Sequence, residues 1–74
     1  MKHTKVTGTL NNWRVQVVTE EEFIIWGEVY GDVHQRFSDG ALIHTSGIKN
    51  RIVKEGDVVH TRNSKYLLGN KQEI

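Results

Sequence analysis

The chain has no cysteine and no proline in 74 residues, and it has no long hydrophobic run. The absence of cysteine excludes disulfide bonds and thiolate zinc sites, and it is typical of proteins in a reducing compartment. The longest apolar runs, Val17–Val18 and Phe23–Trp26, are far shorter than the roughly 20 residues that cross a membrane. No apolar segment follows the basic start Met1–Lys5, as a secretory signal would require. We therefore expect a cytoplasmic protein without a membrane partner.

Motifs for phosphate binding and for nucleophilic catalysis are also missing. There is no Gly-x-x-x-x-Gly-Lys-Ser/Thr, no Gly-x-Gly-x-x-Gly and no Gly-x-Ser-x-Gly segment. A deep, dry pocket is difficult to build in so short a chain. We therefore predict that the protein is not an enzyme; in the enzyme alternative, His44 or His60 would be the general base.

The four histidines lack the short spacing of zinc-binding motifs. They are His3, His34, His44 and His60. His44 and His60 each lie between an apolar residue and a threonine. If a strand at Ile48–Lys54 separates them, they are about 9.6 Å apart, which is too far for one ion. We therefore predict no metal site and no cofactor.

Charge is nearly balanced over the whole chain, with ten basic and nine acidic residues and a formal net charge of +1. This balance weighs against tight, salt-sensitive binding of a polyanion by the molecule as a whole. The distribution is less even, because Glu20–Glu22 concentrates acid in the first half. Six basic residues after position 48 outnumber three acidic ones: Lys49, Arg51, Lys54, Arg62, Lys65 and Lys71 against Glu55, Asp57 and Glu73.

The pattern of apolar residues predicts short β-strands separated by compact turns. Segments with this pattern are Val6–Leu10, Trp13–Thr19, Phe23–Tyr30, Val33–Phe37, Ala41–Ser46, Ile48–Lys54, Asp57–Arg62 and Lys65–Leu68. Turn signals lie between them at Asn11-Asn12, Gly31-Asp32, Asp39-Gly40, Glu55-Gly56 and Asn63-Ser64. No window keeps a helical period, so no helix longer than a single turn is expected.

These segments predict one all-β domain over residues 1–74, in which residues 71–74 fray. Phe23–Tyr30 is apolar on both faces, which indicates a central or bent strand, and Gly27 in its middle is a natural bulge point. The fold class is a small SH3-like barrel or a strongly bent antiparallel meander of about five to seven short strands. Trp13, Trp26, Phe23 and Phe37 are expected in the core, although the pattern leaves open whether Trp13, Trp26 and Tyr30 are core or binding surface.

The second half carries a recurrent pattern built from four elements. They are Asp39-Gly40, then Ile43-His44-Thr45-Ser46, then Lys54-Glu55-Gly56-Asp57, and finally the segment Val59–Gly69, which contains Val-x-Thr-x-Asn-Ser-x-Tyr-x-Leu-Gly. This half resembles a loose class of short bacterial and bacteriophage proteins of unassigned function. The resemblance implies a compact β domain encoded by phages, prophages or their hosts, and it implies no catalytic residue.

Two functions from different classes remain. The first is stoichiometric, non-enzymatic binding to a host macromolecular complex, for example as an anti-CRISPR-like inhibitor, by analogy of size and origin. A partner strand could then pair with Phe23–Tyr30 or with a sheet edge. The alternative is a nucleic-acid-binding barrel that stacks bases on aromatic side chains beside Arg and Lys.

A protein partner is thus expected first and nucleic acid second, and a homodimer is a further alternative because the core is thin. Tyr66 is the aromatic residue most expected to keep one end exposed. The candidate partner-binding residues are Arg36, His44, Arg51, His60, Arg62, Lys65 and Tyr66.

Overall fold

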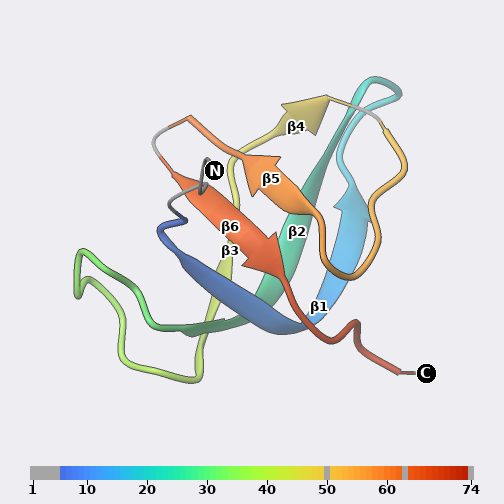
Figure 1. Ribbon diagram of the computed structural model, residues 1–74. Helices are drawn as coiled ribbons and strands as arrows, with labels where there is room; N and C mark the ends of the chain where they lie inside the picture. The colour runs from blue at the N-terminus through green and yellow to red at the C-terminus, as the bar shows by residue number, and fades with distance from the viewer. Residues whose placement is uncertain (1–5, 50, 63, 74) are drawn as a thin grey trace, which may run out of the picture.

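The computed structural model describes residues 6–49, 51–62 and 64–73. Within them the chain forms six strands and no helix (Figure 1). The strands are β1 (Gly8–Val17), β2 (Glu22–Tyr30), β3 (Ala41–His44), β4 (Ile48–Lys49), β5 (Val58–His60) and β6 (Lys65–Leu68). The predicted all-β class is therefore confirmed. None of the described residues belongs to a helix that could span a membrane.

The six strands form one bent sheet in the order β3-β2-β1-β6-β5, with β4 also pairing to β2. β1 and β6 are parallel, whereas every other pair is antiparallel. The parallel pair departs from a purely antiparallel meander: the chain returns through β5 and β6 to lie beside its own first strand. β2 is central, as predicted, so only sheet edges, and not Phe23–Tyr30, are free to accept a partner strand.

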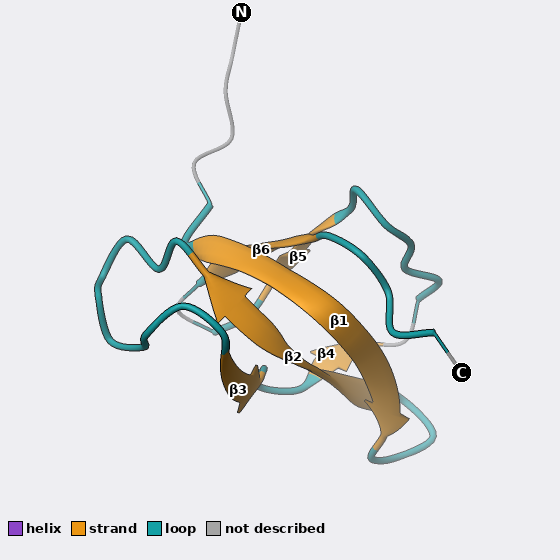
Figure 2. Ribbon diagram, turned by 90° about the horizontal axis from the view of Figure 1, so that it is seen from below, coloured by secondary structure: helices purple, strands orange, loops and turns teal. Residues whose placement is uncertain are grey.

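A β-bulge lies within β1, where the sequence predicts a turn at Asn11-Asn12. Asn11 pairs with Glu28 and Arg14 with Trp26, so β1 has one residue more than β2 between these pairs. Asn12 accommodates the bulge with a φ of 55°, in the left-handed region that asparagine tolerates. The predicted left-handed preference was correct, but it serves a bulge inside one long strand, which Figure 2 shows as a curved ribbon.

The segment Val33–Phe37, predicted as a strand, belongs instead to the loop over residues 31–40. The turn signal at its end is correct, because Gly40 has a φ of 89° and its amide donates to the carbonyl of Val29. This loop connects β2 to β3, and the two strands pair with no strand between them.

The predicted hairpin between Ile48–Lys54 and Asp57–Arg62 is also wrong. β4 ends at Lys49 and pairs with β2, while β5 pairs with β6. The turn at Glu55-Gly56 does form, since the Asp57 amide donates to the Lys54 carbonyl and Gly56 has a φ of 92°. The signal identified the turn correctly, but not the strands that it connects.

Trp13 is the largest fully buried side chain of the core among the described residues. The buried apolar residues are Leu10, Trp13, Phe23, Ile25, Val29, Ile48, Val59, Tyr66 and Leu68. The indole Nε1–H of Trp13 donates to the carbonyl of Gly69 at 2.9 Å, and the amide of Gln72 donates to the carbonyl of Trp13 at 2.8 Å. Fraying was predicted for residues 71–74, but the chain at Lys71 and Gln72 is paired with β1; Ile74 lies outside the described residues.

The sheet curls until its two edges approach each other. The amide of Arg62 donates to the hydroxyl of Ser46 at 3.2 Å, and the Arg51 guanidinium donates to the carbonyl of Val58 at 3.2 Å. The first bond joins the β5–β6 turn to the segment between β3 and β4, and the second joins β5 to the segment that follows β4. We call this line of approach the seam. In a closed barrel, backbone pairing between strands would join the two edges at the seam. Here, hydrogen bonds that involve side chains join them.

Candidate functional site

Three neighbouring hollows follow the seam. The first lies between residues 6–7, residues 33–34 and the β5–β6 hairpin, and the second lies between Arg36–Phe37, the end of β3 and the β5–β6 turn. The third lies between β4, Arg51 and β5. The first two share Thr61, Arg62 and Ser64, and the first and third share His60. The hollows therefore form one continuous surface.

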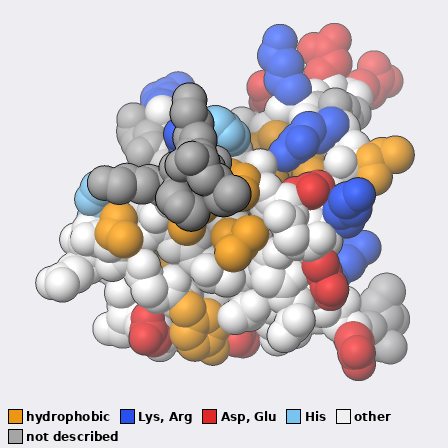
Figure 3. All heavy atoms as spheres, in the orientation of Figure 1, with side chains coloured by type: hydrophobic (Ala, Val, Ile, Leu, Met, Phe, Trp, Pro, Cys, Tyr) orange, Lys and Arg blue, Asp and Glu red, His pale blue; other side chains and the backbone are white. Residues whose placement is uncertain are grey.

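The lining of the three hollows is basic. It includes five cationic side chains and three histidines: Arg36, Lys49, Arg51, Arg62 and Lys65, with His34, His44 and His60. No aspartate or glutamate among the described residues lines any of them. The acidic residues Glu20–Glu22 line other hollows at the β1–β2 turn. Figure 3 shows acidic side chains at the upper right, where Figure 1 places this turn. The acidic residues are therefore gathered at one end of the molecule, and they meet the basic seam at Lys49, which pairs with Glu22 and lines both the third hollow and an acidic hollow.

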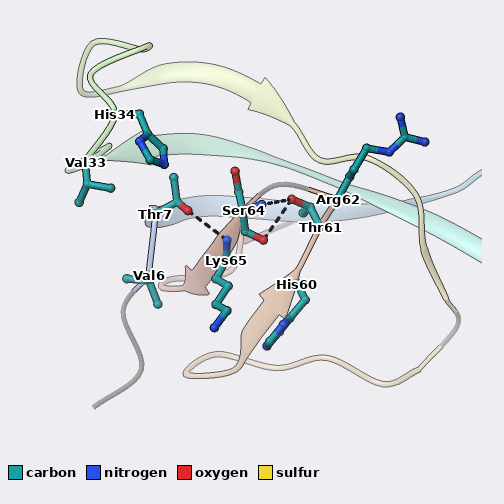
Figure 4. Close-up of a pocket in the computed structure, with 9 residues that line it drawn as sticks. All are labelled: Val6, Thr7, Val33, His34, His60, Thr61, Arg62, Ser64 and Lys65. Carbon is teal, nitrogen blue, oxygen red and sulfur yellow. Dashed lines mark hydrogen bonds between the residues drawn. The ribbon is translucent and has the colours of Figure 1, made fainter. Parts of the chain in front are cut away.

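All seven residues predicted from the sequence to bind a partner line these hollows. Arg36, His44, Arg62 and Tyr66 line the second hollow, while His60, Arg62 and Lys65 line the first. Arg51 and His60 line the third. In Figure 4, His60 and Lys65 extend side by side from β5 and β6, while Arg62 points away from them.

Tyr66, however, does not have the exposed end that the sequence suggested. Its side chain is only 5% exposed and belongs to the core, because β6 runs between β1 and β5 and Tyr66 faces inward with Val59. Phe37 shows the opposite error. It was expected in the core, but it is 38% exposed and lines the second hollow.

The other aromatic residues divide between core and surface. Trp13 is in the core, whereas Tyr30 is 37% exposed and Trp26 is half-buried. Trp26 is flanked across the strands by His44, whose ring centroid lies 4.6 Å from that of Trp26, and by the Arg14 guanidinium at 5.8 Å. His44 thus connects the outer face of the sheet to the second hollow.

Asp32 organises the loop that supplies Arg36 and Phe37. Its carboxylate accepts the backbone amides of His34 at 3.0 Å, Arg36 at 3.0 Å and Phe37 at 3.2 Å. The Arg36 Nε lies 3.8 Å from the same carboxylate. Burial alone would raise the pKa of Asp32, but the three amides and the guanidinium outweigh it, so the pKa lies below its usual 3.8. Because the backbone amides of residues 34, 36 and 37 donate to this carboxylate, they are not available for strand pairing.

Hydrogen bonds join residues from different walls of the second hollow. Arg36 donates from Nη2 to the Ser64 hydroxyl oxygen at 3.3 Å, and the Arg62 amide donates to the Ser46 hydroxyl oxygen. Both serine oxygens act as acceptors here, so both hydroxyl hydrogens are available to an anion. His44 donates from Nδ1 to the carbonyl of Thr45 at 3.0 Å, which leaves Nε2 directed away from the backbone.

The histidines do not form the metal site considered from the sequence. His44 on β3 and His60 on β5 lie on opposite edges of the sheet, so the assumption that a strand at Ile48–Lys54 is the one between them is wrong. No group of three or more His, Cys, Asp or Glu among the described residues could hold a metal ion. His3 lies outside the described residues.

Sequence reasoning missed four contributors to the seam: Asp32, Phe37, Ser46 and Ser64. The signal for Asp32 was present, because aspartate after glycine often accepts neighbouring backbone amides. The two serines carry no such signal, since only the curl of the sheet brings them together.

Comparison with known proteins adds no assignment. No protein-family model matches the chain, and no curated protein and no solved structure matches it either. The resemblance of the second half to short bacterial and phage proteins therefore stays a prediction, and the function is argued from the geometry alone.

Proposed function

We propose that the protein is a non-enzymatic module that binds nucleic acid through its basic seam. The observation that carries the proposal is the lining of the three joined hollows, with five cationic residues, three histidines and no described carboxylate. A continuous basic surface of this kind follows a phosphate backbone, and hydroxyls beside it supply further donors. Nucleic acid was the second expectation from sequence, and the segregation of charge now favours it.

The small net charge does not oppose this proposal. Binding depends on the local potential, and the acidic residues Glu20–Glu22 share no lining residue with the first two hollows; they meet only the third, at Lys49. The single ion pair among the described residues joins Arg36 to Asp32, so Arg51, Arg62 and Lys65 form no ion pair with a described carboxylate. These three side chains can therefore contact phosphates without first breaking a salt bridge.

The test is a titration of fluorescently labelled oligonucleotides with the full chain at increasing salt concentration. We expect log affinity to fall linearly with log salt, with a contribution of about 0.7 to the slope for each phosphate contact on a single strand. Arg62→Ala combined with Lys65→Ala should weaken binding and reduce the slope by about 1.4, since two contacts are lost.

A matched control removes the same charge elsewhere. Lys54 and Lys71 line none of the three hollows, so Lys54→Ala combined with Lys71→Ala should leave the slope nearly unchanged. If both double variants lost affinity and salt dependence equally, net charge, and not the seam, would determine binding. Absence of binding at low salt would reject the proposal.

The second candidate is stoichiometric binding to a host protein complex, including anti-CRISPR-like inhibition. Exposed apolar side chains favour it at the end of the β1–β2 hairpin, where Val17 is 69% exposed and Val18 is 54% exposed. A pull-down from bacterial lysate, with and without nuclease, separates the two functions. One partner complex that survives nuclease and is lost with Val17→Asp would support this candidate.

A further inference from the structure

We infer that the second hollow is a subsite for one nucleotide of a single strand, with the base against Phe37 and the phosphate between Arg36 and Arg62. This inference rests on the proposed function and specifies its ligand. It follows from the residues that line this hollow together: aromatic rings, two guanidinium groups, and hydroxyl groups that include those of Ser46 and Ser64.

The phosphate side of the subsite is preorganised. Arg36 is fixed at three points, with Nε 3.8 Å from the Asp32 carboxylate, Nη2 on the Ser64 hydroxyl, and its guanidinium carbon 5.4 Å from the Phe37 ring centroid. The backbone of Arg62 is anchored on the opposite wall, because its N–H donates a hydrogen bond to the Ser46 hydroxyl oxygen. A phosphate between these walls would meet charge from both arginines and a hydroxyl from each serine, without reorganisation of the loop.

The base side is aromatic. Phe37 is 38% exposed and does not belong to the buried cluster. His44 forms another part of the lining, and its ring is fixed by Trp26 on the outer face and by the Thr45 carbonyl. Stacking on such rings needs the flat face of a base, which is covered in a duplex, so the geometry specifies an unpaired strand.

The experiment compares three labelled ligands at one salt concentration: oligothymidine of about 12 nucleotides, an abasic strand of equal length, and a duplex. With the unmodified chain we expect oligothymidine to bind about tenfold more tightly than the abasic strand, because only the former can stack. Phe37→Leu should remove this advantage while abasic binding stays constant. Phe37→Tyr should retain it. Leu42→Ala, a change at an exposed apolar residue that lines none of the three hollows, should have no effect.

The possible failures are distinguishable. Equal affinity for oligothymidine and the abasic strand, or equal affinity for the duplex, would overturn the nucleotide subsite and leave the nucleic-acid seam in place. If Phe37→Leu weakened the binding of oligothymidine and of the abasic oligonucleotide equally, the subsite would also be overturned, because a general disturbance of the loop would then be the cause. If none of the three ligands binds, the proposed function fails first. The comparison of ligands uses the unmodified chain, so it does not depend on the folding of a variant.

Discussion

Gly27 on β2 lies directly against Trp13 on β1, and a methyl group at Gly27 would be 3.2 Å from the Cβ of Trp13. The same methyl group would be 3.1 Å from the Cβ of Leu10. The absence of a side chain at Gly27 is therefore what allows the bulged segment of β1 to place Trp13 in the core.

Gly27→Ala should destabilise the fold by about 1–3 kcal/mol, as expected when a methyl group is forced into a packed core. Urea unfolding followed by tryptophan fluorescence measures this change. Val18→Ala is the control, because Val18 is exposed and its truncation should change stability by less than about 0.5 kcal/mol. A Gly27→Ala protein as stable as the parent would show that β1 can shift away from β2 at the bulge.

Thr45 lies between β3 and β4 and connects both strands to β2. The chain from β3 to β4 has one residue more than the segment of β2 with which it pairs. Its hydroxyl oxygen accepts the amide of Ile25 at 3.0 Å, and its own hydroxyl donates to the Ser46 carbonyl at 2.8 Å. Thr45→Val keeps the shape but leaves a buried amide without this acceptor, so a loss of about 1–3 kcal/mol is expected.

Thr45→Ser is the matched variant, since it retains the hydroxyl and loses only a methyl group. Its cost should be smaller than that of Thr45→Val. If serine costs as much as valine, or more, packing of the methyl group is responsible and the hydrogen bond is not. Chemical denaturation of both variants beside the parent settles the order.

Trp13 also attaches the C-terminal segment to β1. Trp13→Phe removes the donor to the Gly69 carbonyl and leaves a smaller ring in a fully buried position, for a loss of about 1–3 kcal/mol. The Gln72 amide, which donates to the Trp13 carbonyl, should then exchange faster with deuterium. Trp26→Phe is the control: the Trp26 indole donates to the exposed Gln16 at 2.7 Å, and its loss should leave exchange at Gln72 unchanged.

The sequence supports local predictions better than pairings between distant strands. The turns at Asp39-Gly40 and Glu55-Gly56 were correct, because glycine φ preferences are local. Asn12 had the correct local preference, but its role as a bulge depends on Gly27, which is distant in sequence. The parallel pairing of β1 with β6 depends on how the sheet curls, and no local pattern indicates it.

The same distinction applies to the site. The basic residues Arg36, Arg51, Arg62 and Lys65 were identified from charge alone, and the fold gathers them along the seam. Phe37 was assigned to the core because apolar residues usually belong there. Its exposure follows from the Asp32 carboxylate, which holds the loop at its amide. A pattern of apolar residues cannot predict this hydrogen bond, because it contains no information about which carboxylate accepts which amide.

Asp32→Asn should destabilise the loop at neutral pH. Oδ2 of Asp32 accepts the amides of both Arg36 and Phe37, and an asparagine that keeps the Oδ1 acceptor for His34 would direct its NH₂ group at these two donors. The pKa of Asp32 in the folded protein lies below its usual 3.8, so the ionised carboxylate stabilises the fold above that pH. This contribution is lost as the pH falls through the folded pKa. The stability difference between the parent and Asp32→Asn should therefore narrow below about pH 4. A difference that stays constant during acid titration would contradict the assignment.

The same variant separates positioning from simple charge at the seam. Asp32→Asn removes a negative charge beside Arg36, so electrostatic attraction alone predicts tighter binding of every oligonucleotide. If Asp32 instead holds Arg36 and Phe37 in place, oligothymidine should bind more weakly to the variant and lose its advantage over the abasic strand. The two explanations predict changes of opposite sign for oligothymidine, and one anisotropy titration at fixed salt distinguishes them. Asp39→Asn is the control, because Asp39 lies in the same loop and accepts the amide of Gly31, while among the described residues it has no hydrogen bond or ion pair to Arg36 or Phe37. It removes the same charge, so stronger binding in Asp39→Asn together with weaker binding in Asp32→Asn would assign the loss to the position of the loop.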